Sequence, residues 1–200
     1  GLVWARPLTR TLTRSTNFTA GFHAKSIENF VFKDTTTSKD ELREVTLGWG
    51  GNVNDPKKRF IHNSVITQGL GTAFGGDENG HALASRLNTG NQFTKVNSDL
   101  IHVRQFSARD TGIIRVGFQL STEPLPTAEQ FGIGGPDSVR GFIQSEFLGD
   151  QGYALSAEYN HSVFEKKKLR LQLAAFIERG EASLLEPGPG ERGSKRLVGA

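Results

Sequence analysis

The sequence predicts an all-β chain that forms part of a transmembrane, antiparallel β-barrel. Apolar and polar residues alternate through several runs of about 10 to 15 residues, and roughly 9 to 11 tilted residues suffice for a membrane-crossing strand. Short and long connections between these runs also alternate, as they do in such barrels. A soluble β-sandwich is the alternative, because its strands alternate too, although they are usually shorter.

The hydropathy of the chain also favours strands over helices as membrane-crossing elements. No stretch approaches the roughly 18 apolar residues that a transmembrane helix needs. The mean hydropathy is −0.39, which a barrel tolerates because lumen-facing polar residues alternate with lipid-facing apolar ones. Alternation within each run is therefore the informative signal.

The first half of the chain contains one partial and four complete predicted strands. The partial strand is 3–14. Residues 18–25 alternate Phe and Ala with Thr, Gly, His and Lys, and residues 44–49 alternate Val, Leu and Trp with Glu, Thr and Gly. The runs 59–74 and 92–106 mix both residue types on each face, and their length and neighbours favour strands.

The second half contains three complete predicted strands and a final partial one. Residues 114–121, 153–163 and 169–178 alternate clearly, and residues 194–200 begin another strand. A sheet of these strands has two open edges, which lipid does not tolerate. We therefore expect about eight strands of a 16-stranded type of barrel here, with the remaining strands outside this chain.

The predicted connections fall into two length classes. In outer-membrane barrels the periplasmic turns are short and the extracellular loops are long. Tight turns are predicted around 54–56, 108–110 and 165–167, and long loops at 33–40, 75–90, 122–152 and 179–194.

Composition argues against several other function classes. The 24 cationic and 21 anionic residues are interspersed, and the densest basic run, 166–168, lies at a predicted turn, so we expect no nucleic-acid partner. The absence of Cys excludes disulfides, and the five scattered His residues do not suggest a metal site. No nucleophile, base and oxyanion site assembles, so we expect no enzyme, no cofactor and no small-molecule substrate.

Two further patterns have simpler explanations than ligand binding. Asp137 replaces the third glycine that a dinucleotide fingerprint would need. Residues 77–80 lack the later ligands of a calcium loop and fit a polar extracellular loop. The chain starts at Gly1 with no initiator Met and no signal segment, so we expect a fragment of one barrel domain (1–200).

The longest predicted loop carries the most specific motif. Residues 131–142 read FGIGGPDSVRGF, residues 148–153 read LGDQGY, and the following strand contains SAEY at 156–159. This pattern resembles the haemolysin activation/secretion family, the outer-membrane transporters of two-partner secretion within the BamA-like superfamily. The residues that match the loop-tip motif are Gly134, Gly135, Ser138, Val139, Arg140, Gly141 and Phe142, with Asp150, Gly152 and Glu158 as supporting positions.

The resemblance implies that this loop folds back into the lumen and places its Val-Arg-Gly tip against the inner barrel wall. In the family an acidic residue in a Phe-x-Asp-x-Gly strand motif holds the Arg. The corresponding residues here are Phe176, Glu178 and Gly180. Glu is one methylene longer than Asp, so an ion pair with Arg140 would have a different geometry from the one in the family.

The resemblance also implies a function and its partners. The parent protein would carry periplasmic POTRA domains and would translocate a large exoprotein of the haemolysin or adhesin type across the outer membrane of a Gram-negative bacterium. Its partners would be that exoprotein and the surrounding outer-membrane lipid and lipopolysaccharide. The alternative within the superfamily is a barrel insertase that assembles other outer-membrane proteins.

The residues themselves support a contact between Arg140 and Glu178. Alternation places Glu178 on the polar face of its strand, opposite in phase to Leu173 and Ile177. About 19 residues of loop reach roughly 60 Å, more than the ~25 Å apolar band of a barrel. A guanidinium can bind a carboxylate through two parallel hydrogen bonds. Alternatively, Arg140 lies on an exposed loop and pairs with Asp137.

Overall fold

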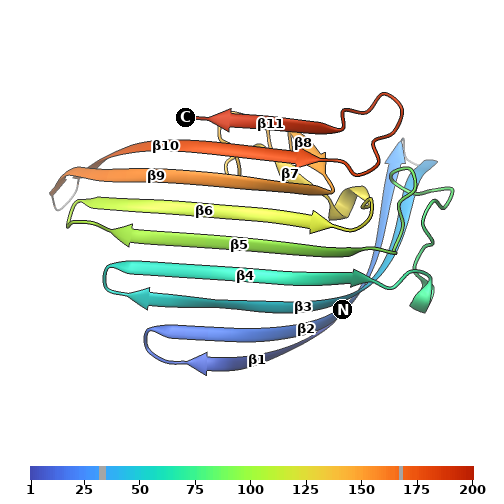
Figure 1. Ribbon diagram of the computed structural model, residues 1–200, viewed down its shortest axis with the longest axis horizontal. Helices are drawn as coiled ribbons and strands as arrows, with labels where there is room; N and C mark the ends of the chain where they lie inside the picture. Colours follow the sequence, from blue (N-terminus) through green and yellow to red (C-terminus); the bar gives the residue numbers. More distant parts are fainter. Residues whose placement is uncertain (32–34, 167–168) are drawn as a thin grey trace.

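The computed structural model describes residues 1–31, 35–166 and 169–200, and most of them lie in one curved antiparallel sheet (Figure 1). This sheet has nine strands in the order β1-β2-β3-β4-β5-β6-β9-β10-β11, and a separate two-stranded sheet pairs β7 with β8. The strands are β1 (Leu2–Arg10), β2 (Arg14–Val31), β3 (Thr35–Asp55), β4 (Lys58–Gly69), β5 (Thr94–Gln105), β6 (Asp110–Ser121), β7 (Phe131–Ile133), β8 (Phe147–Gly149), β9 (Gln151–Lys166), β10 (Leu169–Ser183) and β11 (Ser194–Gly199).

The predicted all-β fold with sequentially paired antiparallel strands is confirmed. Two short 3-10 turns, η1 (Ala73–Gly75) and η2 (Thr127–Glu129), are the helical elements within the described ranges. Neither is long and apolar enough to cross a membrane. The architecture of the described residues is therefore that of the sheet.

The prediction of a long loop at 33–40 is wrong, because β2 and β3 continue pairing to Val31 and Thr35. Their outer ends are polar, and Glu28 faces Lys39 across the ladder with the Lys39 Nζ and Glu28 Oε1 atoms 2.9 Å apart. Thr and cross-strand ion pairs suit a solvated strand, so pairing extends beyond the apolar part. Residues 32–34 of this connection lie outside the described residues.

Two other predicted boundaries also differ from the structure. β4 ends at Gly69, because the following chain turns through Gly71 and Gly75, whose φ angles are +59° and +79°. β10 continues to Ser183, five residues beyond its predicted end. The tight turn at 165–167 and the basic run at 166–168 lie partly outside the described residues.

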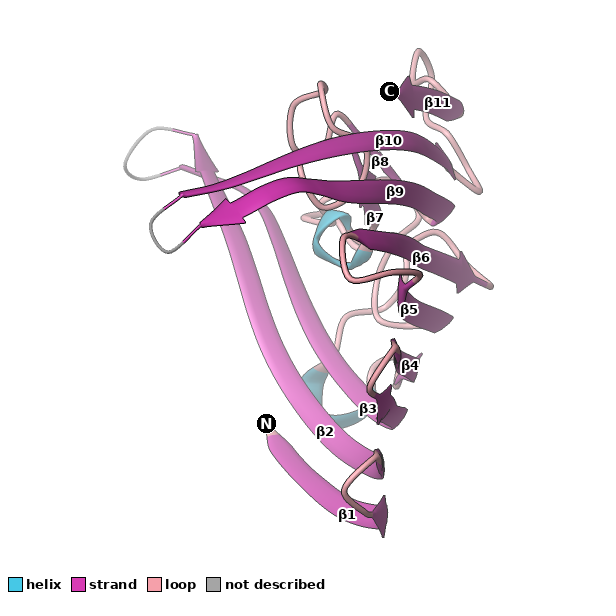
Figure 2. Ribbon diagram, turned by 90° about the vertical axis from the view of Figure 1, so that its left-hand side faces the viewer, coloured by secondary structure: helices cyan, strands magenta, loops and turns pink. Residues whose placement is uncertain are grey.

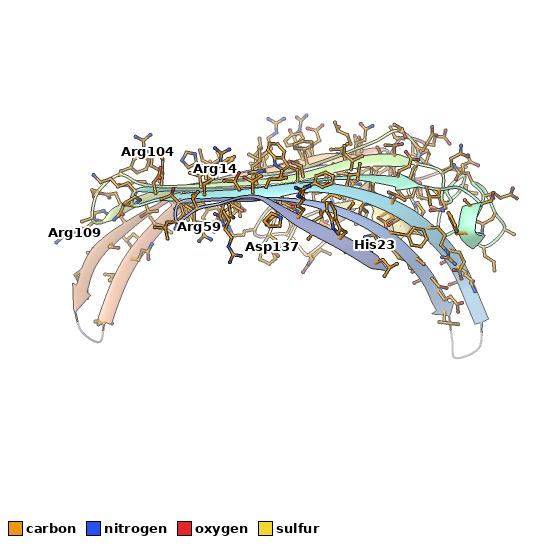
Figure 3. The ribbon with its side chains drawn as sticks, turned by 90° about the horizontal axis from the view of Figure 1, so that it is seen from below. Arg14, His23, Arg59, Arg104, Arg109 and Asp137 are labelled. Atoms are coloured by element: carbon orange, nitrogen blue, oxygen red, sulfur yellow. The ribbon has the colours of Figure 1, made fainter. Side chains whose placement is uncertain are left out.

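The two faces of the sheet have opposite chemistry, as the period-two alternation requires (Figure 3). One face exposes large apolar side chains and the other buries polar ones. The first group has exposed fractions between 42% and 61% and includes Leu47, Trp49, Ile66, Ile114, Leu120, Leu155, Leu173 and Ile177. The second group includes Glu44, Thr67, Lys95, Gln119, Ser156, Asn160 and Glu178. A broad exposed apolar face of this kind suits lipid contact.

The polar side is concave and is filled by residues 122–150, here called the inner loop (Figure 2). It contains η2, β7 and β8, which lie against β9 and β10. A buried apolar cluster joins the two parts and consists of Ile133 and Val139 from the inner loop with Ala182 of β10 and Leu197 of β11. A β-sandwich would need a second large sheet here, so that alternative is wrong for the described residues.

Candidate functional site

The inner loop turns sharply at Gly134 and Gly135, directly after β7. Their φ angles are +101° and +95°, a region that L side chains rarely adopt. A Cβ on Gly134 would also lie 2.5 Å from the Ile143 carbonyl oxygen. Glycine at these two positions therefore lets the chain fold over itself and present residues 136–142, here called the tip, to the sheet.

The tip reaches the sheet through Arg140. Its Nε lies 2.7 Å from Glu178 Oε1, and its backbone N–H donates to Glu178 Oε2 at 2.6 Å. Its Nη1 lies 3.0 Å from Glu158 Oε2 on the neighbouring strand. Glu178 Oε1 also accepts a hydrogen bond from Ser156 Oγ at 3.1 Å. The longer Glu side chain thus binds the backbone and the side chain of one residue together, and Arg140 pairs with strand carboxylates rather than with Asp137.

Alternate residues of β10 hold the tip because they share one face. The Arg140 guanidinium carbon lies 3.6 Å from the centre of the Phe176 ring, a cation–π contact. A Cβ on Gly180 would lie 3.0 Å from Val139 Cγ2, so the missing side chain admits Val139 to the strand. Phe176, Glu178 and Gly180 therefore form one continuous contact surface, here called the β10 seat.

The β10 seat holds a strongly paired but accessible cation. The Glu178 side chain is 3% exposed, whereas that of Arg140 is 32% exposed. Burial acts to lower the pKa of Arg140, but the hydrogen bonds and charges of Glu178 and Glu158 outweigh it and raise the pKa. A cavity of about 540 Å³ adjoins the pair and is also lined by Arg115 and Gln144. The contact is therefore open on one side to whatever occupies the concave face.

The remaining motif residues support the inner loop without touching the Arg140–Glu178 pair. Ser138 Oγ accepts a hydrogen bond from the Gly134 N–H at 3.4 Å. Gly141 has a φ angle of +88°, and Phe142 is exposed. A Cβ on Gly152 would lie 2.6 Å from Phe131 Cδ1, so this glycine makes room for the start of β7.

Asp150 forms a second attachment, at the end of the inner loop. Its Oδ1 lies 2.7 Å from Arg86 Nη1 and accepts the Leu125 N–H at 2.9 Å, and its Oδ2 accepts the Leu185 N–H at 2.8 Å. Asp150 is fully buried, and the Arg86 side chain is 8% exposed. This pair joins the inner loop to both the 70–93 and the 184–193 connections.

Glu129 forms a third attachment, at the beginning of the inner loop. Its carboxylate lies 2.6 Å from Lys25 Nζ of β2 and 2.7 Å from Lys95 Nζ of β5. Lys25 also pairs with Glu44 of β3 at 2.8 Å. Burial acts to raise the pKa of Glu129, but the two ammonium groups outweigh burial and hold that pKa below its ordinary value.

Arg86, Lys95 and Glu129 are not among the site residues that the sequence predicts. Arg86 lies in an irregular connection, where no periodicity marks it. The sequence does contain one indication of the cluster around Glu129 and Lys95. Lys25 falls on the polar face of its alternating strand, and a buried cation there requires an acidic partner. Among the described residues, no group of three or more His, Asp or Glu side chains is placed to hold a metal ion.

Comparisons with known proteins identify the family and the fold of the chain. A family model described as haemolysin secretion/activation protein ShlB/FhaC/HecB matches residues 1–200. Among solved structures, CdiB from Escherichia coli superimposes with a TM-score of 0.76 at 22% sequence identity. The match covers 98% of this chain and 36% of the CdiB chain, and it shows a common fold. A search of curated proteins found no match.

Proposed function

Because the chain belongs to the haemolysin secretion/activation protein family ShlB/FhaC/HecB, we propose that it forms part of an outer-membrane pore that translocates a large exoprotein in two-partner secretion. The observation that carries the proposal is the attachment of Arg140 to Glu178 on the concave face of a sheet whose convex face is apolar. A loop held inside a barrel by a charge pair is a means of closing the pore.

The opposite chemistry of the two faces supports the membrane position. Apolar side chains on the convex face would meet outer-membrane lipid and lipopolysaccharide. The short connections, such as the one between β3 and β4, would face the periplasm, and the irregular 70–93 connection would face the outside. The concave face would line the pore, where polar side chains meet water.

The inner loop suggests how transport proceeds. A haemolysin- or adhesin-type exoprotein, unfolded on entry, would displace the tip from the β10 seat and pass along the polar wall. Arg140 is one-third exposed and borders open space, so a competing carboxylate or backbone carbonyl of the exoprotein could reach it. The step would need no nucleotide hydrolysis, because it exchanges one set of polar contacts for another.

The test replaces Arg140 with Ala in the full-length protein and measures the exoprotein in the culture medium. We expect secretion to be lost while the protein stays in the outer membrane. Arg179→Ala is a matched control, because Arg179 adjoins Glu178 on β10 but lies on the other face. Normal secretion by Arg140→Ala would contradict the proposed role.

The same strains separate secretion from the insertase alternative. An insertase would be required for other outer-membrane proteins, so its loss would lower their amount in the membrane. We expect those amounts to stay normal in the Arg140→Ala strain and only the exoprotein to be affected. A gene for a large exoprotein beside the gene for this protein would support the same assignment.

A further inference from the structure

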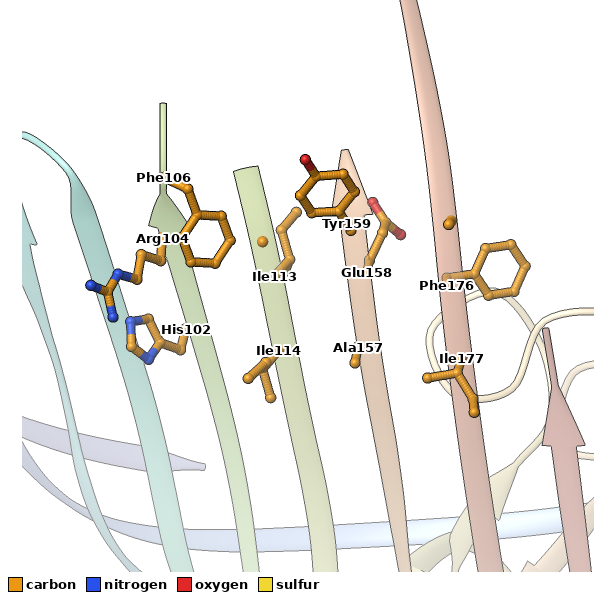
Figure 4. Close-up of a pocket in the computed structure, with 12 residues that line it drawn as sticks. His102, Arg104, Phe106, Ile113, Ile114, Ala157, Glu158, Tyr159, Phe176 and Ile177 are labelled. Carbon is orange, nitrogen blue, oxygen red and sulfur yellow. The ribbon is translucent and has the colours of Figure 1, made fainter. Parts of the chain in front are cut away.

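The convex face contains a groove near the short-turn end of β5, β6, β9 and β10 (Figure 4). Its volume is about 640 Å³, and its lining includes His102, Arg104, Ile114, Ala157 and Ile177. These residues come from four adjacent strands on the face opposite the β10 seat. The groove, here called the outer groove, is bordered by none of the inner-loop residues, although Glu158 and Phe176, which contact Arg140, are also among its lining residues.

Strand register explains why this part of the face is hollow. Ala157 of β9 pairs with Ile114 on one side and with Ile177 on the other, so a small side chain lies between two large ones. In the next row, Tyr159 pairs with Gly112 and with Ala175. The Phe106 ring covers Gly112, where an added Cβ would lie 2.7 Å from Phe106 Cε2. The two alanines, Ala157 and Ala175, leave the space that a flexible alkyl chain could fill, because cross-strand neighbours on one face are in contact.

One end of the outer groove is cationic and aromatic. The Arg104 guanidinium carbon lies 5.7 Å from the centre of the Phe106 ring, and Arg104 projects from the convex face (Figure 3). The nearest acid of the adjoining turn, Asp110, is occupied, because its Oδ1 accepts the Tyr159 hydroxyl at 2.6 Å and lies 2.7 Å from His161 Nδ1. Within the described ranges, Arg104 has no carboxylate within ion-pair distance.

We propose that the outer groove binds one anionic phospholipid of the phosphatidylglycerol type, with an acyl chain along Ile114, Ala157 and Ile177 and the phosphate at Arg104. A guanidinium binds phosphate through paired charge-assisted hydrogen bonds. Aromatic residues such as Phe106 and Tyr159 mark the depth at which barrels meet lipid headgroups. A zwitterionic headgroup would bring its own cation beside Arg104, so charge complementarity favours the anionic lipid.

The inference rests on the proposed membrane position, which assigns the short-turn end to the periplasmic leaflet. Exposed cations at this end, including Arg14 and Arg109, strengthen the attraction for anionic lipid. A general attraction of this kind would not depend on Arg104 in particular. The experiment therefore compares cations inside and outside the outer groove.

The experiment titrates the full-length protein in detergent with dioleoyl phosphatidylglycerol and counts bound lipids by native mass spectrometry. We expect Arg104→Gln to weaken binding of the first lipid by roughly fivefold, because one cation near a lipid surface contributes about that factor. Ala157→Phe keeps the charge and fills the outer groove, so it should weaken phosphatidylglycerol and phosphatidylethanolamine alike. Arg109→Gln is the matched control and should change binding by less than about twofold.

Three results would overturn the inference. Arg104→Gln could bind like the unchanged protein, Arg109→Gln could lose as much affinity as Arg104→Gln, or glycerol phosphate without acyl chains could compete as well as the lipid. A failure of the secretion proposal would look different, because it would appear as normal secretion by Arg140→Ala in cells. Absence of the protein from the outer-membrane fraction would instead refute the membrane position on which both depend.

Discussion

Two regions hold the inner loop against the concave face, and they differ in burial. At the tip, Arg140 meets Glu178 with its own side chain 32% exposed and a cavity beside it. At the two ends of the loop, Asp150 is fully buried against Arg86, and Glu129 is buried between Lys25 and Lys95. A buried charge that loses its partner is costly, whereas an accessible one can be solvated. The difference indicates fixed ends and a releasable tip.

The largest expected effect comes from breaking a fixed end. Asp150→Ala would remove the acceptor of the Leu125 and Leu185 N–H groups and the buried carboxylate partner of Arg86, which would keep only its backbone carbonyl acceptors. We expect a loss of about 3–5 kcal/mol in the free energy of unfolding, measured by denaturant titration in detergent. Asp137→Ala removes an exposed carboxylate from the same loop and should change the free energy of unfolding little. Equal effects of the two variants would abolish the distinction between ends and tip.

The next largest effect concerns the β10 seat. Glu178→Ala removes the acceptor for both the side chain and the backbone of Arg140, and Glu158 remains to solvate the cation. We expect a cost between the roughly 1 kcal/mol of an exposed pair and the 3–5 kcal/mol of a buried one. Hydrogen exchange of residues 136–142 should rise, while exchange around Asp150 stays slow. Glu178→Asp should retain part of the contact, and a uniform rise along the whole loop would count against a releasable tip.

A smaller effect is expected at Gly180, where the tip packs without charge. The added methyl group of Gly180→Ala would press on Val139, and overpacking of this kind costs about 1–3 kcal/mol. Combining it with Val139→Ala should recover most of the loss, which a double-mutant cycle measures. Gly193→Ala is the control, because its Cβ would make ordinary contact with Pro187. An additive cycle would show that Val139 and Gly180 are not coupled.

The smallest expected effect is the pH dependence of the Glu129 attachment. The folded protein holds the pKa of Glu129 below the ordinary value of 4.5, so this carboxylate stabilises the fold fully above that pH. The contribution is lost as the pH falls from about 4.5 through the lower folded value. Protease cleavage near residues 122–130 should therefore increase only in acid, and Glu129→Gln should remove that dependence. Increased cleavage at alkaline pH would contradict this prediction, because the Glu129 carboxylate stays ionised there.

The sequence predicted the faces of the strands better than their ends. Alternation assigns Glu178 to one face and Leu173 and Ile177 to the other, and the exposed fractions of 3%, 60% and 61% agree. Strand ends are harder, because a polar ladder such as that between Glu28 and Lys39 looks like a loop in the sequence. Its hydrogen bonds are made by the backbone, and they continue wherever the partner strand continues.

The sequence by itself determined which residues lie on the apolar convex face and which lie on the polar concave face, because the direction of a strand side chain follows from local backbone geometry. It also marked the tip and the β10 seat through the family motif. Only the tertiary structure decided the partners of the buried charges. Arg86 and Asp150 are 64 positions apart, and Lys25 and Glu129 are 104 apart. Such pairs depend on the curvature of the whole sheet and on the path of the loop across it, and no local pattern encodes either.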